Sequence, residues 1–268
     1  MNPIDVKRRI DLAELLNGKF KKEIPGWVIR LLGKILCIPQ LNHFMDLTPG
    51  DGWNFSENLT RTMNLNLEVK GLENVPADGT LYTFVSNHPL GGADGVMLSS
   101  IIGKNFGDLW VPVTDFLMAI KPLRKIWIPV NKVGSQARTL SSKLDEGFKS
   151  DRQMLVFPAG LCSRRKKGVL KDLPWKKTFI TKSVQTGRAI VPIHFIGENS
   201  SFYYTVTNMF DGMKFNPSMI FLPREFVNSA GKTFKVIFGK PIPAETFDSS
   251  RSALEWAQLV REKVYELE

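Results

Sequence analysis

The sequence predicts an α/β fold with a mixed, largely parallel central sheet of about seven strands and helices on both faces, preceded by an N-terminal amphipathic helical segment. Two observations predict this fold. Short apolar runs typical of buried strands alternate along the chain with segments of helical periodicity. The chain has 268 residues and is 43% hydrophobic, which is enough for one large domain with a substantial core.

The two ends of the chain differ in character. We predict a basic amphipathic, membrane-associating helical segment over residues 1–63 and the main domain over residues 64–268. No run reaches about 18 consecutive apolar residues, so no membrane-spanning helix is expected, and the charged N-terminus shows no secretory signal. The two cysteines, Cys37 and Cys162, are far apart and lack metal-site spacing, which predicts no metal and a reducing compartment.

Within the first segment, Pro25 is expected to begin a helix. Its apolar face runs from Trp27 to Ile38 and is interrupted by two basic residues, and Pro39 is expected to end it. A basic amphipathic helix with a tryptophan near its start is a candidate for lying in a membrane interface. The other interpretation is that this face packs on the main domain.

The main domain reads in order as a series of strands and helices. Strands are expected at residues 66–69, 81–85, 109–113, 126–132, 154–157, 189–195, 219–223 and 234–242. Helices are expected at residues 53–63, 95–103, 135–150, 171–186 and 253–267. Ser249 and Ser250 are expected to cap the last of them.

A histidine and a carboxylate lie close together where the strand at residues 81–85 ends. The sequence there is FVSNHPLGGADG, with His88 directly after the polar pair that ends the strand and Asp94 six residues further on. A histidine at a strand end can take a proton near neutral pH, and a carboxylate bonded to its other nitrogen fixes its tautomer and orientation. The alternative is a glycine-rich turn with a structural histidine and a helix-capping aspartate.

The segment SNHPLGGADG resembles the His–Asp block of the PlsC-like glycerolipid acyltransferase family, and the resemblance spans roughly residues 67–240. It implies that His88 is the general base and that Asp94 orients it. The family usually has four residues between the two, whereas this chain has five: Pro, Leu, Gly, Gly and Ala. That spacing is similar to a bacterial branch that includes O-acyltransferases of amino-acid lipids, such as lyso-ornithine and lyso-glycine lipids.

Two further family blocks are altered. The family's second block ends in an arginine that contacts the acceptor's phosphate, and Asn131 and Lys132 stand there in this chain. The third block, FPEGTRS in the family, reads FPAGLCSR at residues 157–164 and is followed by three more cations. The resemblance implies these substrate-binding residues: Asn87, Gly91, Gly92, Asn131, Lys132, Phe157, Pro158, Gly160, Ser163, Arg164 and Arg165. The alternative is a structural role for both: Asn131 and Lys132 would be ordinary turn residues at a strand end, and the cations would lie in a solvated loop.

Acyl transfer to a hydroxyl requires a base and an oxyanion site. The chain has no G-x-S-x-G motif and neither cysteine has a catalytic setting, so we expect direct transfer without a covalent acyl-enzyme. The oxyanion donors are expected among the backbone N–H groups of residues 157–161 or of Gly91 and Gly92. No cofactor is expected, because acyl carrier protein or coenzyme A brings the acyl group as a thioester. The net charge of +10 suits an acidic carrier.

The resemblance implies a lyso-lipid acceptor, and loss of the family arginines favours a lyso-amino-acid lipid over lysophosphatidic acid. The expected location is peripheral, on the cytoplasmic face of the inner membrane. Three alternatives remain at this point: an enzyme that makes phosphatidic acid, an inactive lipid-binding member of the family, and a nucleic-acid-binding protein. The last is motivated by net charge alone, and the chain has no recognisable nucleic-acid-binding motif.

Overall fold

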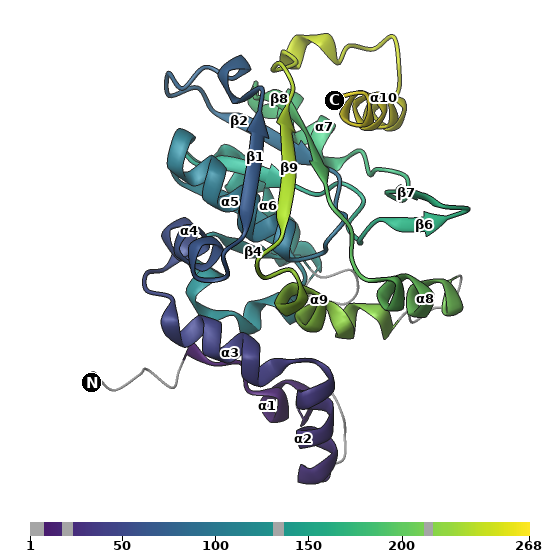
Figure 1. Cartoon of the computed structure of the whole chain (residues 1–268). Coiled ribbons are helices and arrows are strands. Elements are labelled where there is room, and N and C mark those ends of the chain that lie inside the picture. Colours follow the sequence, from purple (N-terminus) through teal and green to yellow (C-terminus); the bar gives the residue numbers. More distant parts are fainter. Residues whose placement is uncertain (1–7, 18–23, 131–136, 212–216) are drawn as a thin grey trace.

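A mixed sheet forms the centre of the molecule. The computed structural model describes residues 8–17, 24–130, 137–211 and 217–268. These residues form a seven-stranded sheet in the order β1-β9-β8-β2-β5-β3-β4 (Figure 1). Neighbouring strands are parallel except β8 and β9, so the predicted fold class is confirmed. The strands are β1 (Asn66–Lys70), β2 (Tyr82–Ser86), β3 (Leu109–Val113), β4 (Trp127–Pro129), β5 (Gln153–Val156), β8 (Ala189–Ile196) and β9 (Thr233–Phe238).

Helices and one small hairpin complete the described structure. The helices are α1 (Leu12–Asn17), α2 (Gly26–Ile35), α3 (Ile38–Leu47), α4 (Gly52–Thr62), α5 (Ala93–Phe106), α6 (Ala137–Lys149), α7 (Thr178–Thr186), α8 (Ser201–Met209), α9 (Leu222–Asn228) and α10 (Ala253–Tyr265). Strands β6 (Arg164–Lys166) and β7 (Val169–Lys171) form an antiparallel hairpin outside the main sheet.

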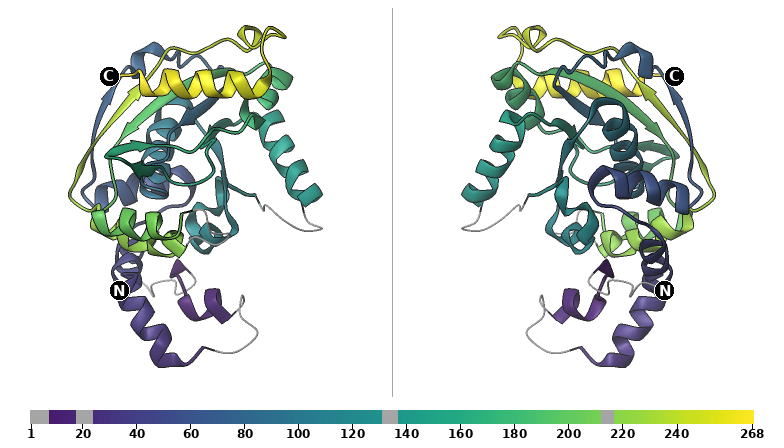
Figure 2. Two further views of the ribbon diagram at one scale, coloured as in Figure 1. Left: turned by 90° about the vertical axis from the view of Figure 1, so that its right-hand side faces the viewer. Right: turned by 90° about the vertical axis from the view of Figure 1, so that its left-hand side faces the viewer.

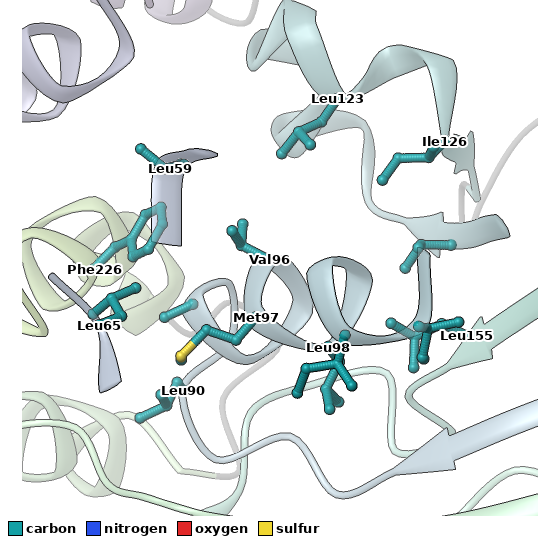
Figure 3. Close-up of a cluster of buried hydrophobic side chains, with 14 of the residues drawn as sticks. Leu59, Leu65, Leu90, Val96, Met97, Leu98, Leu123, Ile126, Leu155 and Phe226 are labelled. Carbon is teal, nitrogen blue, oxygen red and sulfur yellow. The ribbon is translucent and has the colours of Figure 1, made fainter. Parts of the chain in front are cut away.

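The two faces of the sheet are buried by different helices. Side chains alternate between the faces of a strand, and the neighbours Phe84 and Val85 on β2 belong to two separate core clusters. Phe84 lies in the cluster that includes Met97 and Leu98 of α5, which Figure 3 shows together with Leu155 of β5. Val85 lies in the cluster built by α7 and α10. Burial on both faces explains why β2 is mostly apolar and buried along its whole length.

Five strands have their carboxyl ends at the same edge of the sheet. Strands β8, β2, β5, β3 and β4 run in the same direction, so their carboxyl ends lie at the same edge. The N-terminal helices α1–α3 lie at this end, and α10 lies at the opposite end of the molecule (Figure 2). Open α/β sheets bind ligands at the carboxyl ends of their strands, which makes this the end to examine.

Helix α2 is apolar on two sides. Leu36, which follows the helix, belongs to the main core cluster. Trp27, Leu31 and Ile35 recur at every fourth residue on the other side and are 64%, 51% and 43% exposed. No helix in the described ranges is both long and apolar enough to cross a bilayer. The exposed row is therefore an apolar surface on an element that cannot span a membrane.

Three element predictions were wrong, and proline explains two of them. Cys37 adopts φ 56° and separates α2 from α3, so Pro39 lies in the first turn of a new helix instead of ending the old one. Residues 219–223 are not a strand: a 3₁₀ segment (Pro217–Phe221) leads into α9, whose first turn contains Pro223. Proline lacks an N–H and has a fixed φ, which suits the first turn of a helix.

The third error concerns where two helices begin. The predicted helix over residues 171–186 starts only at Thr178, because the residues before it form β7 and an extended turn. The cap of α10 is Ser252, whose hydroxyl accepts from the Glu255 N–H while the Glu255 carboxylate accepts from the Ser252 N–H and hydroxyl. This reciprocal arrangement satisfies two N–H groups at the helix start, which the predicted serines do not do.

Candidate active site

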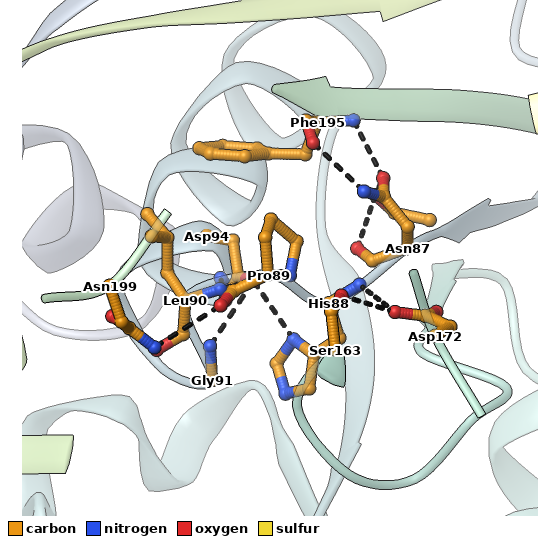
Figure 4. A network of polar contacts seen from close by, with 12 residues as sticks. Asn87, His88, Pro89, Leu90, Gly91, Asp94, Ser163, Asp172, Phe195 and Asn199 are labelled. Carbon is orange, nitrogen blue, oxygen red and sulfur yellow. Dashed lines mark hydrogen bonds and ion pairs between the residues drawn. The ribbon is translucent and has the colours of Figure 1, made fainter. Parts of the chain in front are cut away.

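The predicted histidine and aspartate meet at the end of β2. His88 follows the strand directly, Asp94 lies in the first turn of α5, and His88 Nδ1 is 3.1 Å from Asp94 Oδ2 (Figure 4). The Asp94 side chain is fully buried, whereas that of His88 is 15% exposed. An Nδ1–H donated to the carboxylate leaves Nε2 as the nitrogen that can accept a proton. This is the arrangement that a general base requires.

The loop between the two residues is shaped by the same carboxylate. Asp94 Oδ2 also accepts hydrogen bonds from Leu90 N (2.9 Å) and Gly91 N (3.3 Å), and Oδ1 accepts one from Gly95 N (2.8 Å). Gly91 adopts φ 75°, a backbone conformation that residues other than glycine rarely adopt. The turn at Gly91 accommodates the fifth residue of the spacing, so the longer loop still brings Asp94 to His88.

The environment of His88 makes it a stronger base than a free histidine. Burial lowers the pKa of the imidazole, but the charge of Asp94, the hydrogen bond to Asp94 and the charge of Asp172 together outweigh burial. The pKa of His88 is therefore raised above its ordinary value of 6.5. The ring also lies against Phe157, with centroids 4.1 Å apart and planes inclined by 30°. Both contacts restrict its orientation.

A second buried carboxylate, Asp172, binds the backbone of the histidine. Its Oδ1 accepts from the His88 N–H (3.1 Å) and from the Ser163 hydroxyl (2.5 Å), and its Oδ2 accepts from Trp175 Nε1 (2.8 Å). Burial raises the pKa of Asp172, and these three hydrogen bonds oppose the rise. Asp172 thus joins the His88 loop to the segment before α7. Asp172 was not among the site residues predicted from the sequence.

Two asparagines fix the same loop through backbone groups. The Asn87 side chain donates to the Phe195 carbonyl (2.9 Å) and accepts from the Phe195 N–H (2.7 Å), which joins the end of β2 to β8. Asn199 donates to the carbonyls of Pro89 (3.2 Å) and Leu90 (3.5 Å). Figure 4 shows the Asn87 side chain directed at Phe195 and the Asn199 side chain directed at the loop. Rigid support of this kind holds a catalytic histidine in one position.

A cavity opens beside His88. Its volume is about 360 Å³, within the usual range for ligand sites, and its walls are mostly apolar. The walls come from the strand ends, from the first helices and from α9, including Leu12, Leu36, Leu41, Val113, Leu117 and Phe226. An apolar cavity that reaches from the histidine to the N-terminal helices can hold a hydrocarbon chain.

The predicted site residues that the structure describes divide into two groups. The cavity is lined by His88, Gly91, Gly92, Phe157, Pro158 and Gly160, and the fully buried Asp94 holds His88. Asn87, Ser163, Arg164 and Arg165 are outside the lining and bond to protein groups instead. Asn131 and Lys132 lie outside the described residues. The two N–H groups of Gly91 and Gly160 are engaged, by Asp94 and by the Phe157 carbonyl.

The run of cations after the third block is folded away from the cavity. Arg165 forms an ion pair with Glu198 and lies 4.4 Å from the centre of the Tyr204 ring. Lys166 pairs with Asp211 at 2.8 Å. Arg164 is buried at the start of β6 and donates to the Cys162 carbonyl (3.3 Å). Two of the cations that follow the third block are therefore paired with carboxylates of the protein itself.

Cys162 lines the cavity but is a poor nucleophile. The residue is buried, and burial raises the pKa of its thiol to about 12. Thiolate is the reactive form of cysteine, so almost no reactive form is present near neutral pH. The thiol instead packs against Gly91, where any side chain would overlap it.

Comparisons with known proteins agree with this geometry. The model of a family described as "Acyltransferase" matches residues 12–268. A lyso-glycine lipid O-acyltransferase of Bacteroides thetaiotaomicron is 45% identical over 265 residues, covering 96% of this chain and 97% of the relative. A lyso-glycine lipid O-acyltransferase of Phocaeicola vulgatus is also 45% identical, with 96% and 95% covered. The crystal structure of the 1-acyl-sn-glycerophosphate acyltransferase PlsC from Thermotoga maritima shares the fold, with a TM-score of 0.50, 16% identity, and coverage of 95% of this chain and 86% of that one.

Proposed function

Because this chain belongs to the acyltransferase family and is an O-acyltransferase, we propose that it moves a fatty acyl group from an acyl thioester to the free hydroxyl of a lyso-glycine lipid. The observation that carries the proposal is the His88–Asp94 pair, 3.1 Å apart beside an apolar cavity. The acceptor is inferred from two relatives that are each 45% identical to this chain over nearly their whole length.

The proposed reaction uses His88 twice. Nε2 removes the proton from the acceptor hydroxyl as its oxygen attacks the thioester carbonyl, and the imidazolium is stabilised by Asp94. The tetrahedral intermediate then collapses, the carbon–sulfur bond breaks, and the leaving thiolate takes the proton from His88. The amino end of α5 begins beside Gly92 at the cavity and carries partial positive charge, which suits the developing oxyanion.

We propose acyl carrier protein or coenzyme A as the source of the thioester. The net charge of +10 supports an acidic partner, and both carriers are acidic. The two are separated by supplying each carrier with the same acyl chain and measuring kcat/KM for transfer. Salt should weaken the reaction with a carrier protein that is attracted by charge.

We also propose that the enzyme works at the surface of a membrane, on its cytoplasmic face. The apolar row of Trp27, Leu31 and Ile35 on α2 is exposed, and α1 and α3, on either side of α2, supply walls of the cavity. A helix that inserts this row into the headgroup region would place the cavity beside the lipid that it receives. Basic residues Arg30 and Lys34 on the same helix are exposed and suit anionic lipid.

The test is acyl transfer by the purified protein with two acceptors in competition. Lyso-glycine lipid and lysophosphatidic acid are supplied together with a long-chain acyl thioester, and both products are measured. We expect the lyso-glycine lipid to be acylated with the higher kcat/KM. The reverse preference would mean that the chain makes phosphatidic acid, and no transfer to either lipid would favour an inactive lipid-binding member of the family.

A histidine replacement tests the base. His88→Ala should lower kcat by about 10²–10⁴-fold, which is the usual contribution of general base catalysis. His43, an exposed histidine on α3, provides the matched control, because His43→Ala should leave the rate unchanged. Retention of more than about a tenth of the activity in His88→Ala would contradict the assignment.

A further inference from the structure

The described walls of the cavity carry a single permanent charge. Among the residues that line it in the described part of the chain, Lys176 is the one lysine, and neither arginine, aspartate nor glutamate occurs there. The other ionisable residues in this lining are His88 and Cys162. Cavity walls that are otherwise apolar leave one place where a charged group of a lipid can be bound.

Lys176 is held beside the catalytic turn. Its backbone N–H donates to the Pro158 carbonyl (3.1 Å), and its Nζ would be 2.9 Å from a Cβ built on Gly160. The ammonium group therefore lies over Gly160, in the same turn as Phe157, whose ring lies against His88. A ligand group that contacts Nζ would lie in the cavity that His88 also lines, at the turn that carries Phe157 and Gly160.

The segment before α7 fixes this position. Trp175 is 1% exposed, and its indole N–H donates to Asp172. The side-chain amide of Gln258 accepts a hydrogen bond from the Trp175 N–H (3.2 Å) and donates one to the Trp175 carbonyl (2.7 Å). Asp172 also binds the backbone of His88, so one carboxylate sets the positions of the histidine and of the segment that carries Lys176. The backbone that carries Lys176 and the backbone of the base are thus held by the same contacts.

Lys176 also differs from two cations that follow the third block, Arg165 and Lys166. Arg165 and Lys166 pair with Glu198 and Asp211, whereas the ion pairs found among the described residues do not include Lys176. An exposed ammonium at the edge of an apolar cavity can bind an oxyanion without first breaking an internal salt bridge. A lysine presents one charge, which matches a carboxylate more closely than a phosphate monoester with nearly two.

We propose that Lys176 binds the carboxylate of the acceptor and so determines that the enzyme takes an acidic lyso-amino-lipid. The inference rests on the proposed function and adds the residue that recognises the headgroup. It places the free hydroxyl of the acceptor at His88 and the carboxylate at Nζ, with the hydrocarbon chain along the apolar walls. Selectivity then comes from a residue outside the three sequence blocks.

The test compares two acceptors that differ only in the carboxylate. Unmodified enzyme and Lys176→Met are each given lyso-glycine lipid and its methyl ester, with the acyl thioester held saturating. Because a hydrogen bond to a charged group contributes about 1.5–3 kcal/mol, Lys176→Met should lose at least about tenfold in kcat/KM for the free acid. The same replacement should change the rate with the ester little. The ratio of acid to ester therefore falls by about tenfold.

Lys177 is the matched control, because it is exposed, adjacent and outside the cavity lining. Lys177→Met should keep the ratio of the unmodified enzyme, and Lys176→Arg should keep most of it. Equal loss on acid and ester, or a rise in KM for the thioester instead of the acceptor, would overturn the inference while leaving the proposed function intact. Failure of the unmodified enzyme to acylate lyso-glycine lipid would overturn both.

Discussion

Replacement of Gly91 by alanine tests how the longer His–Asp loop is built. Gly91 adopts φ 75°, and an added Cβ would overlap the Cys162 Sγ and approach the Leu222 Cδ2 to 2.8 Å. Gly92, the next residue, has φ −169°, and a Cβ there has nothing within 4 Å. The two adjacent glycines thus provide a replacement that the structure forbids and one that it permits.

The magnitude follows from two costs. A left-handed backbone costs an alanine about 1–2 kcal/mol, and an overpacked side chain costs about 1–3 kcal/mol. Together, Gly91→Ala should destabilise the protein by about 2–5 kcal/mol, or lower Tm by roughly 4–20 °C at about 2–4 °C per kcal/mol. Gly92 caps α5, so Gly92→Ala should cost only about 1 kcal/mol or less.

Thermal unfolding of the variants provides the assay, with acyl transfer measured in parallel. Gly91→Ala should also lose activity, because the Gly91 N–H would move away from Asp94. Cys162→Ala removes the overlapping sulfur, so in that background Gly91→Ala should be milder by about 1–2 kcal/mol. Equal Tm values for Gly91→Ala and Gly92→Ala would refute the reasoning, and so would an effect that does not depend on Cys162.

Three other perturbations have expected outcomes. Because the pKa of His88 is raised above 6.5 and the base must be neutral, kcat/KM should fall as pH drops through a value above 6.5, and a midpoint at or below 6.5 in the pH profile would contradict this. Asp172→Asn removes a negative charge that raises this pKa, so the acid limb should shift to lower pH and Tm should fall; an unchanged profile would argue against a positioning role. Replacing Trp27 and Leu31 together by serine should weaken vesicle co-sedimentation by about tenfold or more, since each apolar side chain contributes about 1.5–3 kcal/mol on burial. Val169→Ser, on the exposed hairpin, is the control, and equal binding by both variants would speak against the α2 surface.

The sheet was largely predictable because its strands are buried on both faces. Runs such as the one ending at Ser86 are buried throughout and mostly apolar, and their alternation with helices indicates a parallel sheet without knowledge of tertiary contacts. The strand predicted at residues 219–223 was wrong because a short apolar run fits a helix as well as a strand. Its proline, now in the first turn of α9, was the local signal for the correct element.

The candidate site was predictable where neighbours in sequence are neighbours in space. His88 and Asp94 are six residues apart, so their pairing can be inferred from one loop. Asp172 could not be found in this way, because it meets the His88 N–H across 84 positions, and an aspartate in a charged stretch gives no signal of its own. Arg165 was predicted to bind substrate, but it pairs with Glu198. This carboxylate is 33 residues away, so the local sequence does not reveal the pair.

The protonated thiol of Cys162 has a consequence for the order of events. Burial raises the pKa of the cysteine that lines the cavity to about 12, which makes this thiol a poor acceptor of the acyl group. If transfer is direct, as the sequence predicts, both substrates must be bound before the first bond forms. Initial-velocity plots against the thioester at several acceptor concentrations should then give intersecting lines instead of the parallel lines of a ping-pong mechanism. Without acceptor, the enzyme should release no burst of thiol. Direct transfer would commit an acyl chain only when the lipid that will receive it is already bound.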